Sequence, residues 1–263
     1  KTQEAMTEKT EEEMFATMER SLQVMKESVQ DGLDKDKRSA SGLTGGDAYK
    51  LNEALKAGKN IAGHFFGNAM MKAVAVAQTN ACMGRIVASP TAGSCGILPC
   101  ALLTLQEEKN ISDKDLVMAL FTASAVGIVI ATNASVAGAA GGCQAECGAA
   151  SAMAAAAMVE LCGGTPKQCE HACAIALKNI LGLVCDPVAG LVEIPCIKRN
   201  AGGVGNALVA AELALAGVES HIPADEVIVA MKKIGDTMSS TLKETAEGGL
   251  AVTPTGKKLC EKV

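Results

Sequence analysis

Three cysteines of this chain lie in polar surroundings that a packed hydrophobic core would not favour. Cys143 follows two glycines, Cys185 precedes an Asp-Pro pair, and Cys196 follows a proline. Three thiolates can hold three irons of a [4Fe–4S] cluster and leave the fourth iron open. An open iron is a Lewis acid, whereas a cluster with four cysteine ligands mainly transfers electrons. The spacing of 42 and then 11 residues is unlike compact ferredoxin runs, and buried free cysteines are common, so packing is the competing interpretation.

The other cysteines give weaker signals. Cys169 and Cys173 share a predicted helix and could chelate zinc, but no second ligand pair accompanies them. Cys260 lies near the end of the chain, where a packing role is least expected. A mobile thiol there could reach the open iron and block it, or it could be an incidental exposed cysteine. Five others have apolar or small neighbours and are interpreted as packing residues: Cys82, Cys95, Cys100, Cys147 and Cys162.

A second motif is the loop Ser89–Gly96, which is rich in glycine and hydroxyl groups and leads into a predicted helix. Its glycines permit close backbone approach, and its hydroxyl and N–H groups suit a carboxylate, although ordinary turns share this composition. Glu146, three residues after Cys143, could act as an acid or base, support a ligand by hydrogen bonding, or simply begin a helix. His64 and His221 have no recognisable partner and are more typical of structural histidines.

Composition and periodicity predict that helices position these motifs. The chain of 263 residues is 49% hydrophobic but only 2% aromatic, and it contains 27 glycines, which favours closely packed helices. No alternating strand segment, repeat or linker is present. We therefore expect an all-α fold, a single compact helical domain over residues 1–263 with buried Ala/Gly-rich central helices and glycine-rich active-site loops. Residues 1–35 should contain an amphipathic helix, and residues 248–263 should be a flexible, irregular tail.

Start signals place several of these helices. Ser112 and Thr165 have N-cap spacing, Asp47 could cap the helix after the loop that precedes it, and Asp186 with the following proline would begin a helix. The uncharged run Leu116–Ala131 is interpreted as a buried central helix, because polar residues follow it and no Lys/Arg bias or aromatic belt flanks it as in a membrane span. Further helices are predicted over 62–81, 97–108, 144–162, 200–217 and 223–238.

Charge and cysteine content limit the class of protein. The formal net charge is −5, and no basic stretch alternates with aromatic residues, which argues against nucleic acid as a partner. Eleven cysteines, an odd number, and the absence of a recognisable signal peptide argue against a disulfide framework. We therefore expect a cytoplasmic protein with reduced thiols and no membrane partner.

Three long motifs in a fixed order identify a family resemblance: residues 86–99 (IVASPTAGSCGILP), 141–146 (GGCQAE) and 185–201 (CDPVAGLVEIPCIKRNA). They resemble the alpha chain of the iron–sulfur-dependent L-serine dehydratases, and Ser41–Asp47 and Gly248–Ala251 add to the match. The resemblance implies an all-helical catalytic unit with a [4Fe–4S] cluster. The resemblance implies that the cluster ligands are Cys143, Cys185 and Cys196. It implies that the substrate is bound by Ser89, Thr91, Gly93, Ser94 and Asn133.

The resemblance also implies a partner. Single-chain members carry an additional N-terminal domain that helps to close the active site, which this sequence lacks, so we expect a separate beta chain and a hetero-oligomer. Some members end in a cysteine that caps the fourth iron, whereas three residues follow Cys260 here. The role of Cys260 as a tail cap or base is therefore a hypothesis.

The implied reaction is the β-elimination of L-serine to pyruvate and ammonia, within amino acid degradation and gluconeogenesis. The open iron would stabilise the leaving hydroxyl group, and a base would remove the α-proton. Candidate bases are Cys260, a histidine or a beta-chain residue. Pyridoxal-phosphate-dependent dehydration is disfavoured because no lysine adjoins the Ser89 loop. An L-cysteine desulfidase-type lyase on the same cluster, and a non-catalytic iron–sulfur sensor or assembly subunit, remain as alternatives.

Overall fold

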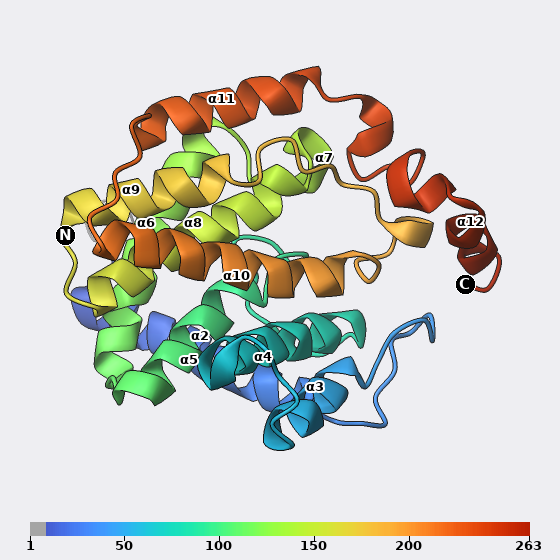
Figure 1. Cartoon of the computed structure of the whole chain (residues 1–263), viewed down its shortest axis with the longest axis horizontal. Coiled ribbons are helices and arrows are strands. Elements are labelled where there is room, and N and C mark those ends of the chain that lie inside the picture. Colours follow the sequence, from blue (N-terminus) through green and yellow to red (C-terminus); the bar gives the residue numbers. More distant parts are fainter. Residues whose placement is uncertain (1–8) are drawn as a thin grey trace.

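The computed structural model describes residues 9–263, which fold into α-helices joined by loops and short 3-10 helices (Figure 1). Within this range there is no β-strand, and a single parallel bridge joins Cys185 to Lys243. The predicted all-α class is thus confirmed. The α-helices are α2 (Glu11–Gly32), α3 (Asp47–Lys56), α4 (Gly63–Ala81), α5 (Ile97–Lys109), α6 (Asp113–Asn133), α7 (Gly138–Gly141), α8 (Cys143–Leu161), α9 (Pro166–Lys178), α10 (Cys196–Leu215), α11 (Ala224–Thr237) and α12 (Pro254–Cys260). The 3-10 helices are η1 (Val188–Gly190), η2 (Ser240–Leu242) and η3 (Gly249–Val252).

The central helix of the core is α8. It packs against α5, α6, α9 and α10, and nearly all of its residues from Cys143 to Val159 are buried. Its many alanines make it apolar on every side, as expected of a helix enclosed by other helices. Because alanine side chains are small, the neighbouring helices can approach closely without aromatic filling. The expected Ala-rich buried helix is therefore present, and its first residue is Cys143.

Helix α6 is more exposed than its uncharged sequence suggests. Only 33% of its most apolar stretch is buried, and Met118, Ile128 and Val129 are exposed. One side packs on α8, where a Cβ on Gly127 would lie 3.0 Å from the Met153 Sδ atom. By length and hydropathy α6 alone, among the described helices, could cross a membrane. The prediction of a buried central helix here is wrong, because apolar composition does not reveal how many sides of a helix are covered.

Two of the four predicted start signals are used. Thr165 forms a capping box at α9, and Ser112 accepts a hydrogen bond from the Asp115 N–H group at the start of α6. Thr10, which is not among the four predicted signals, forms a second capping box at α2. Helix α2 begins at Glu11, so residues 1–8 of the predicted N-terminal segment lie outside the described range. Asp47 does not cap α3, because Gly46 occupies the N-cap position.

Two further predictions need correction. The sequence after Cys185 forms only the 3-10 helix η1, because the Asp186 carboxylate pairs with Arg199 and accepts the Leu250 N–H group instead of capping a helix. The C-terminal segment is not irregular: it forms η3 and then α12, with Thr253 as the N-cap of α12. Both α12 and η3 lie beside η1, at the end of the molecule where α10 begins (Figure 1).

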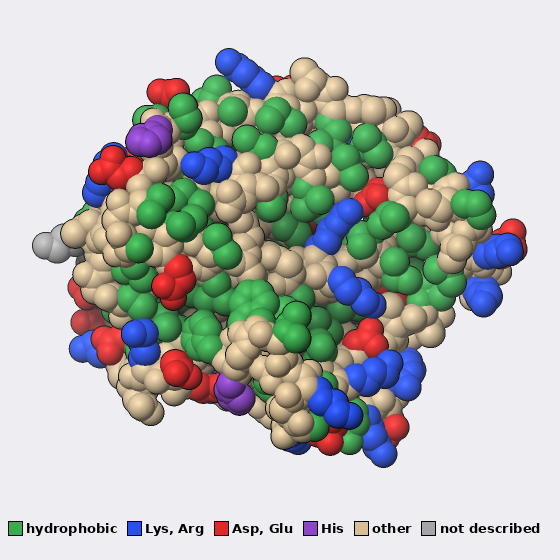
Figure 2. All heavy atoms as spheres, viewed as in Figure 1, with side chains coloured by type: hydrophobic (Ala, Val, Ile, Leu, Met, Phe, Trp, Pro, Cys, Tyr) green, Lys and Arg blue, Asp and Glu red, His purple; other side chains and the backbone are tan. Residues whose placement is uncertain are grey.

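The surface in Figure 2 carries basic side chains close to acidic ones rather than in one continuous basic patch on this face. Several neighbours form exposed ion pairs, including Lys167 with Glu170 and Lys232 with Asp236, both 2.8 Å apart. Exposed pairs of this kind contribute little to stability. Helix packing in the core therefore carries the stability of the fold.

Two adjacent glycines of α10 give a test of that packing. A Cβ on the buried Gly203 would lie 2.3 Å from the Ile97 Cδ1 atom, whereas a Cβ on the exposed Gly202 would meet nothing within 4 Å. We expect Gly203→Ala to lower the free energy of unfolding by about 1–3 kcal/mol through overpacking against the fully buried Ile97. Gly202→Ala, the matched control, should raise it by up to about 1 kcal/mol because alanine favours helix. Urea unfolding measures both, and equal values would contradict the packing argument.

Candidate metal centre and substrate site

The three predicted ligand cysteines come from three different segments. Cys143 and Cys196 are the first residues of α8 and α10, where the helix dipole and free N–H groups stabilise thiolates. The turn into α8 requires Gly142, whose φ is 76° and whose Cβ would lie 2.8 Å from the Leu183 carbonyl oxygen. Cys185 instead lies in an extended segment, where its N–H group donates to Leu242 and its carbonyl accepts from Glu244, both at 2.9 Å.

Two of these thiols meet one carboxylate. The Sγ atoms of Cys143 and Cys185 and a carboxylate oxygen of Glu146 all lie within 4.8 Å of one another. Both cysteines are buried, and this is the one group of three such ligand residues found among the described residues. Cys196 lies outside the group, but it is near enough for charge on Cys143 to add to the effect of burial, which raises the pKa of the Cys196 thiol to about 12. Its place among the ligands stays a prediction.

Cys143 is the most activated thiol. Hydrogen bonds from the Cys147 and Cys185 thiols, and the Arg199 guanidinium, hold the pKa of Cys143 far below its usual value despite burial. The Arg199 Nη1 atom lies 3.4 Å from the Cys143 Sγ atom. A thiolate is the form that binds metal, so this environment suits a ligand. The interpretation of Cys147 as a packing residue missed its contact with Cys143. The signal was its position four residues after Cys143, on the same face of the helix.

Glu146 lies between the thiols and the Ser89–Gly96 loop. Its Oε1 atom accepts a 2.7 Å hydrogen bond from the Thr91 hydroxyl, and its Oε2 atom lies 3.9 Å from the Cys143 Sγ atom. Burial raises the pKa of Glu146 to about 7, although the hydrogen bond from Thr91 opposes this shift. A Cβ on Gly93 would lie 3.0 Å from the carboxylate. The loop backbone is therefore in direct contact with this side chain.

The loop presents hydroxyl groups in a buried setting. Ser94 is fully buried, and its Oγ atom lies 3.0 Å from the Thr91 Oγ1 atom. Ser89 is 4% exposed, and its hydroxyl has no hydrogen-bond partner among the described residues. Buried polar groups are almost always hydrogen-bonded, so an unpartnered hydroxyl is where a polar ligand would bind.

Two residues support the site through contacts that the sequence did not predict. The Asn200 side chain accepts from the Gly96 N–H group and donates to the Gly93 and Cys196 carbonyls. The Glu193 carboxylate accepts from the Ser41 and Thr44 hydroxyls at 2.9 and 2.6 Å, which ties their loop to the segment between Cys185 and Cys196. Both lie inside the 185–201 motif. Apart from Cys196, which is four residues from Asn200, their partners are about 100 to 150 residues away in the sequence, so no local pattern points to these contacts.

The C-terminal segment is fastened to the same site. Asp186 forms a 2.8 Å ion pair with Arg199 and accepts the Leu250 N–H group at 2.8 Å. Gly249 sits directly against this carboxylate at a φ of 58°, and a Cβ there would lie 2.3 Å from an Asp186 oxygen. A bridge also joins Cys185 to Lys243. Residues 242–250 are therefore held against the segment that contains Cys185 and Asp186.

Two predicted site residues are not brought to the thiols by any described hydrogen bond. Asn133 is exposed at the end of α6, where its amide donates to the Val129 carbonyl at 2.8 Å. Cys260 is the last residue of α12 and is exposed. The roles proposed for both residues stay predictions. Cys169 donates to the Ala156 carbonyl, and it does not join Cys173 in any metal-ligand group of the described residues.

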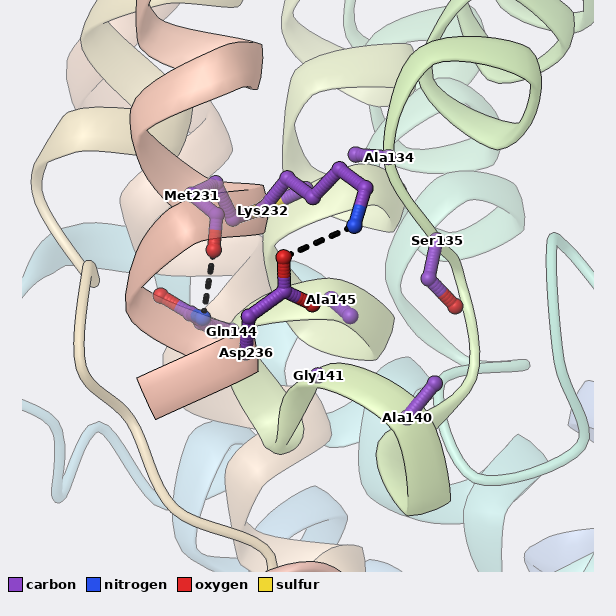
Figure 3. Close-up of a pocket in the computed structure, with 9 residues that line it drawn as sticks. All are labelled: Ala134, Ser135, Ala140, Gly141, Gln144, Ala145, Met231, Lys232 and Asp236. Atoms are coloured by element: carbon purple, nitrogen blue, oxygen red, sulfur yellow. Dashed lines mark hydrogen bonds and ion pairs between the residues drawn. The ribbon is translucent and has the colours of Figure 1, made fainter. Parts of the chain in front are cut away.

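A pocket of about 220 Å³ lies on another side of the first turn of α8 (Figure 3). Gln144 lines this pocket, and its side-chain amide donates to the Met231 carbonyl at 3.0 Å and accepts the Gly182 N–H group at 2.9 Å. Lys232 and Asp236 form an ion pair at its edge (Figure 3). No thiol lines this pocket. Gln144 therefore anchors the turn that carries Cys143 against α11.

The sequence matches the family described as "Serine dehydratase alpha chain" over residues 1–251. The chain belongs to this family. It is 56% identical over 258 residues to the probable L-serine dehydratase alpha chain of Bacillus subtilis (strain 168), covering 98% of this chain and 86% of that protein. It is 47% identical over 250 residues to the L-serine dehydratase alpha chain of Peptoniphilus asaccharolyticus, covering 95% and 86%. The L-serine dehydratase of Streptomyces coelicolor is 47% identical over 182 residues, but this chain covers only 40% of it. The family match contains the thiol group, Glu146 and the Ser89–Gly96 loop.

The fastening of the C-terminal segment gives a prediction. Asp186→Ala removes the partner of both Arg199 and the Leu250 N–H group. Since a hydrogen bond to a charged group contributes about 1.5–3 kcal/mol, amide exchange in residues 249–260 should become at least tenfold faster. Hydrogen-exchange mass spectrometry measures this. Asp236→Ala, which breaks an exposed ion pair on α11, is the control and should leave the segment unchanged. Equal exchange in both variants would show that Asp186 does not hold it.

Proposed function

We propose that this chain is the alpha subunit of an L-serine dehydratase, a lyase that converts L-serine to pyruvate and ammonia with a [4Fe–4S] cluster. The observation that carries the proposal is the meeting of two buried thiols, Glu146 and the hydroxyl-rich loop at one place in a chain of this family. Loss of the α-proton and the hydroxyl group as water gives 2-aminoacrylate, whose imine tautomer hydrolyses to pyruvate and ammonia. Each atom of the overall reaction is thereby accounted for.

The donor set fits an iron–sulfur cluster. Thiolates are the ligands that such clusters require, and the environment of Cys143 already favours its thiolate. We propose Cys143, Cys185 and Cys196 as the ligands. A cluster with three cysteine ligands supplies a Lewis-acidic iron, which favours departure of a hydroxyl group. Arg199 would donate to the coordinating sulfur of Cys143, as it does to that atom here.

The Ser89–Gly96 loop would bind the substrate carboxylate. Its support is the unpartnered, buried Ser89 hydroxyl and the close packing of Gly93 against Glu146. The Thr91 and Ser94 hydroxyls are bonded to Glu146 and to each other, which fixes the loop in place. Hydroxyl and backbone N–H groups are suited to anions when they are already fixed in place. A serine held here would be bound by its carboxylate and have its Cα region near Glu146.

We assign the removal of the α-proton to Glu146. It is the side chain that contacts both Cys143 and the substrate loop, and it is an ionisable group in a buried setting. A positioned base is needed because the α-proton of an amino acid is weakly acidic. The Thr91 hydroxyl would orient the carboxylate. This assignment leaves Cys260 as a candidate cap of the site rather than as the base.

A beta chain would complete the enzyme. The relatives from B. subtilis and P. asaccharolyticus are named as alpha chains, while the S. coelicolor relative is a longer protein of which this chain covers 40%. We therefore propose a hetero-oligomer in the cytoplasm, in which the second chain supplies part of the cover over the site.

The ligand assignment predicts the behaviour of cysteine variants. After anaerobic reconstitution with iron and sulfide, together with the beta chain, the protein should produce pyruvate from L-serine. Cys143→Ala, Cys185→Ala and Cys196→Ala should each lose bound iron and at least 99% of the activity, about 2.7 kcal/mol of barrier. Iron content, the visible spectrum and a pyruvate assay measure this.

Two further variants are controls for the cysteine series. Cys147→Ala removes a thiol that touches Cys143 but should retain the cluster, because a fourth cysteine ligand would leave no open iron. Cys162 lies at the far end of α8, about 28 Å from Cys143 by helix rise, so Cys162→Ala should change neither the iron content nor the activity. Iron loss in Cys147→Ala would overturn the assignment of three cysteine ligands. A cluster that forms without any turnover in the complete enzyme would overturn the lyase activity.

The role of Glu146 predicts a separation of cluster binding from turnover. Glu146→Gln keeps the shape of the side chain and its contact with Thr91 but removes the base. We expect a decrease of about 10²–10⁴-fold in kcat, the usual contribution of a general base, with unchanged iron content. Glu244→Gln, which changes a nearby carboxylate whose charge acts on Glu146, is the matched control and should stay within a few-fold of wild type. A fully active Glu146→Gln variant would exclude this base.

A further inference from the structure

We propose that Asn200 is a positioning residue that fixes the substrate loop against the helix turn that carries Cys196. This inference rests on the proposed function, since it assigns to Asn200 the geometry between the carboxylate-binding loop and a thiol ligand. Asn200 itself is 1% exposed. It is on α10, one helical turn after Cys196.

The Asn200 side chain makes three hydrogen bonds. Its Oδ1 atom accepts the Gly96 N–H group at 2.8 Å, and its Nδ2 atom donates to the Gly93 carbonyl at 2.8 Å and to the Cys196 carbonyl at 3.0 Å. The first two bonds clamp both ends of the Gly93–Gly96 stretch, and the third joins them to the backbone of a predicted ligand. The segments held together are about 100 residues apart in the sequence.

Only an amide of this length satisfies all three partners. An acceptor must face the Gly96 N–H group while a donor faces two carbonyl oxygens, and asparagine offers both within one planar group. Aspartate could still accept the hydrogen bond from the Gly96 N–H group. Its second carboxylate oxygen would, however, face the two carbonyl oxygens and repel them. Alanine would leave the Gly96 N–H group and the Gly93 carbonyl without this partner, which is costly inside a protein.

The clamp also reaches Glu146. Gly93 is pulled toward α10 by Asn200, and its other side touches Glu146, since a Cβ on Gly93 would lie 3.0 Å from the Oε1 atom. Gly96 lies close to the α4 backbone, because a Cβ there would lie 2.5 Å from the Ala73 carbonyl oxygen, so no larger residue fits at this position. Displacement of the loop would thus change its position relative to both the thiols and Glu146. Misplacement of about 1 Å can cost about 10²-fold in rate.

The same helix supplies a matched control. Asn206 lies six residues later on α10, and its amide also joins α10 to a neighbour, donating to the Ala176 carbonyl at 2.8 Å and accepting from Asn179 at 3.0 Å. Its partners belong to α9 and the residue that follows it. Asn206 therefore matches Asn200 in residue type and helix but touches neither the substrate loop nor a predicted ligand.

The test compares two pairs of variants in the reconstituted enzyme with its beta chain and in the cluster-free protein. For Asn200→Asp we expect a KM for L-serine at least tenfold above wild type, with iron content and the cluster spectrum retained, whereas Asn206→Asp should change KM less than twofold. For Asn200→Ala, amide exchange of residues 91–97 in the cluster-free protein should become at least tenfold faster, whereas Asn206→Ala should leave that segment unchanged.

The outcomes separate this inference from the proposed function. Exchange and KM that are the same in the Asn200 and Asn206 variants would overturn the positioning role. Faster exchange of the loop in Asn200→Ala, together with a raised KM in Asn200→Asp, would establish it. If wild-type enzyme makes no pyruvate, the proposed function fails, and the exchange comparison still decides whether Asn200 holds the loop. If Asn200→Asp does not fold, Asn200→Ala supplies both readouts.

Discussion

The buried ion pair between Arg199 and Asp186 is the interaction on which the arrangement of the site depends. The Arg199 and Asp186 side chains are only 17% and 4% exposed, and each has a second task. Arg199 also donates to the Cys143 Sγ atom and the Val184 carbonyl, and Asp186 also accepts the Leu250 N–H group. Removing one partner of a buried pair typically costs 3–5 kcal/mol because the other charge is left uncompensated. The pair therefore links α10, which carries Arg199, to the start of α8, to the Cys185 segment and to the C-terminal segment.

The helical fold could be predicted from the sequence where the determining interactions are local. Ser112 and Thr165 cap helices as predicted because each cap and its partner are three residues apart. The predictions failed where distant partners decide. Asp186 resembles a helix start but is used by Arg199 and Leu250, so η1 replaces the expected helix. In the same way, the uncharged sequence of α6 predicts a helix that is buried on all sides, but α6 packs against fewer neighbours than α8 does.

The candidate site could be predicted only in part for the same reason. The glycines and prolines around Cys143, Cys185 and Cys196 set these thiols apart, and Cys143 and Cys185 do meet. The contacts that hold them are long-range: Thr91 with Glu146, Gly93 with Asn200, and Ser41 with Glu193. A hydrogen bond over 55 to 152 residues leaves no periodicity in the sequence. Only the three-dimensional arrangement shows why these polar residues occur in the family motifs.

Glycines let the backbone pack directly against the Glu146 side chain, so this site needs no aromatic side chains to enclose it. A Cβ on Gly138 would lie 2.9 Å from the Glu146 carboxylate and 3.0 Å from the Cys185 Sγ atom. Gly93 is packed as closely on the other side of that carboxylate. The backbone packs against Glu146 at these two glycines, and burial is the largest influence on its pKa. Small residues therefore have two effects in this protein. They let other helices pack on every side of α8, and they let the backbone cover Glu146 in its first turn, which is neither freely solvated nor ion-paired.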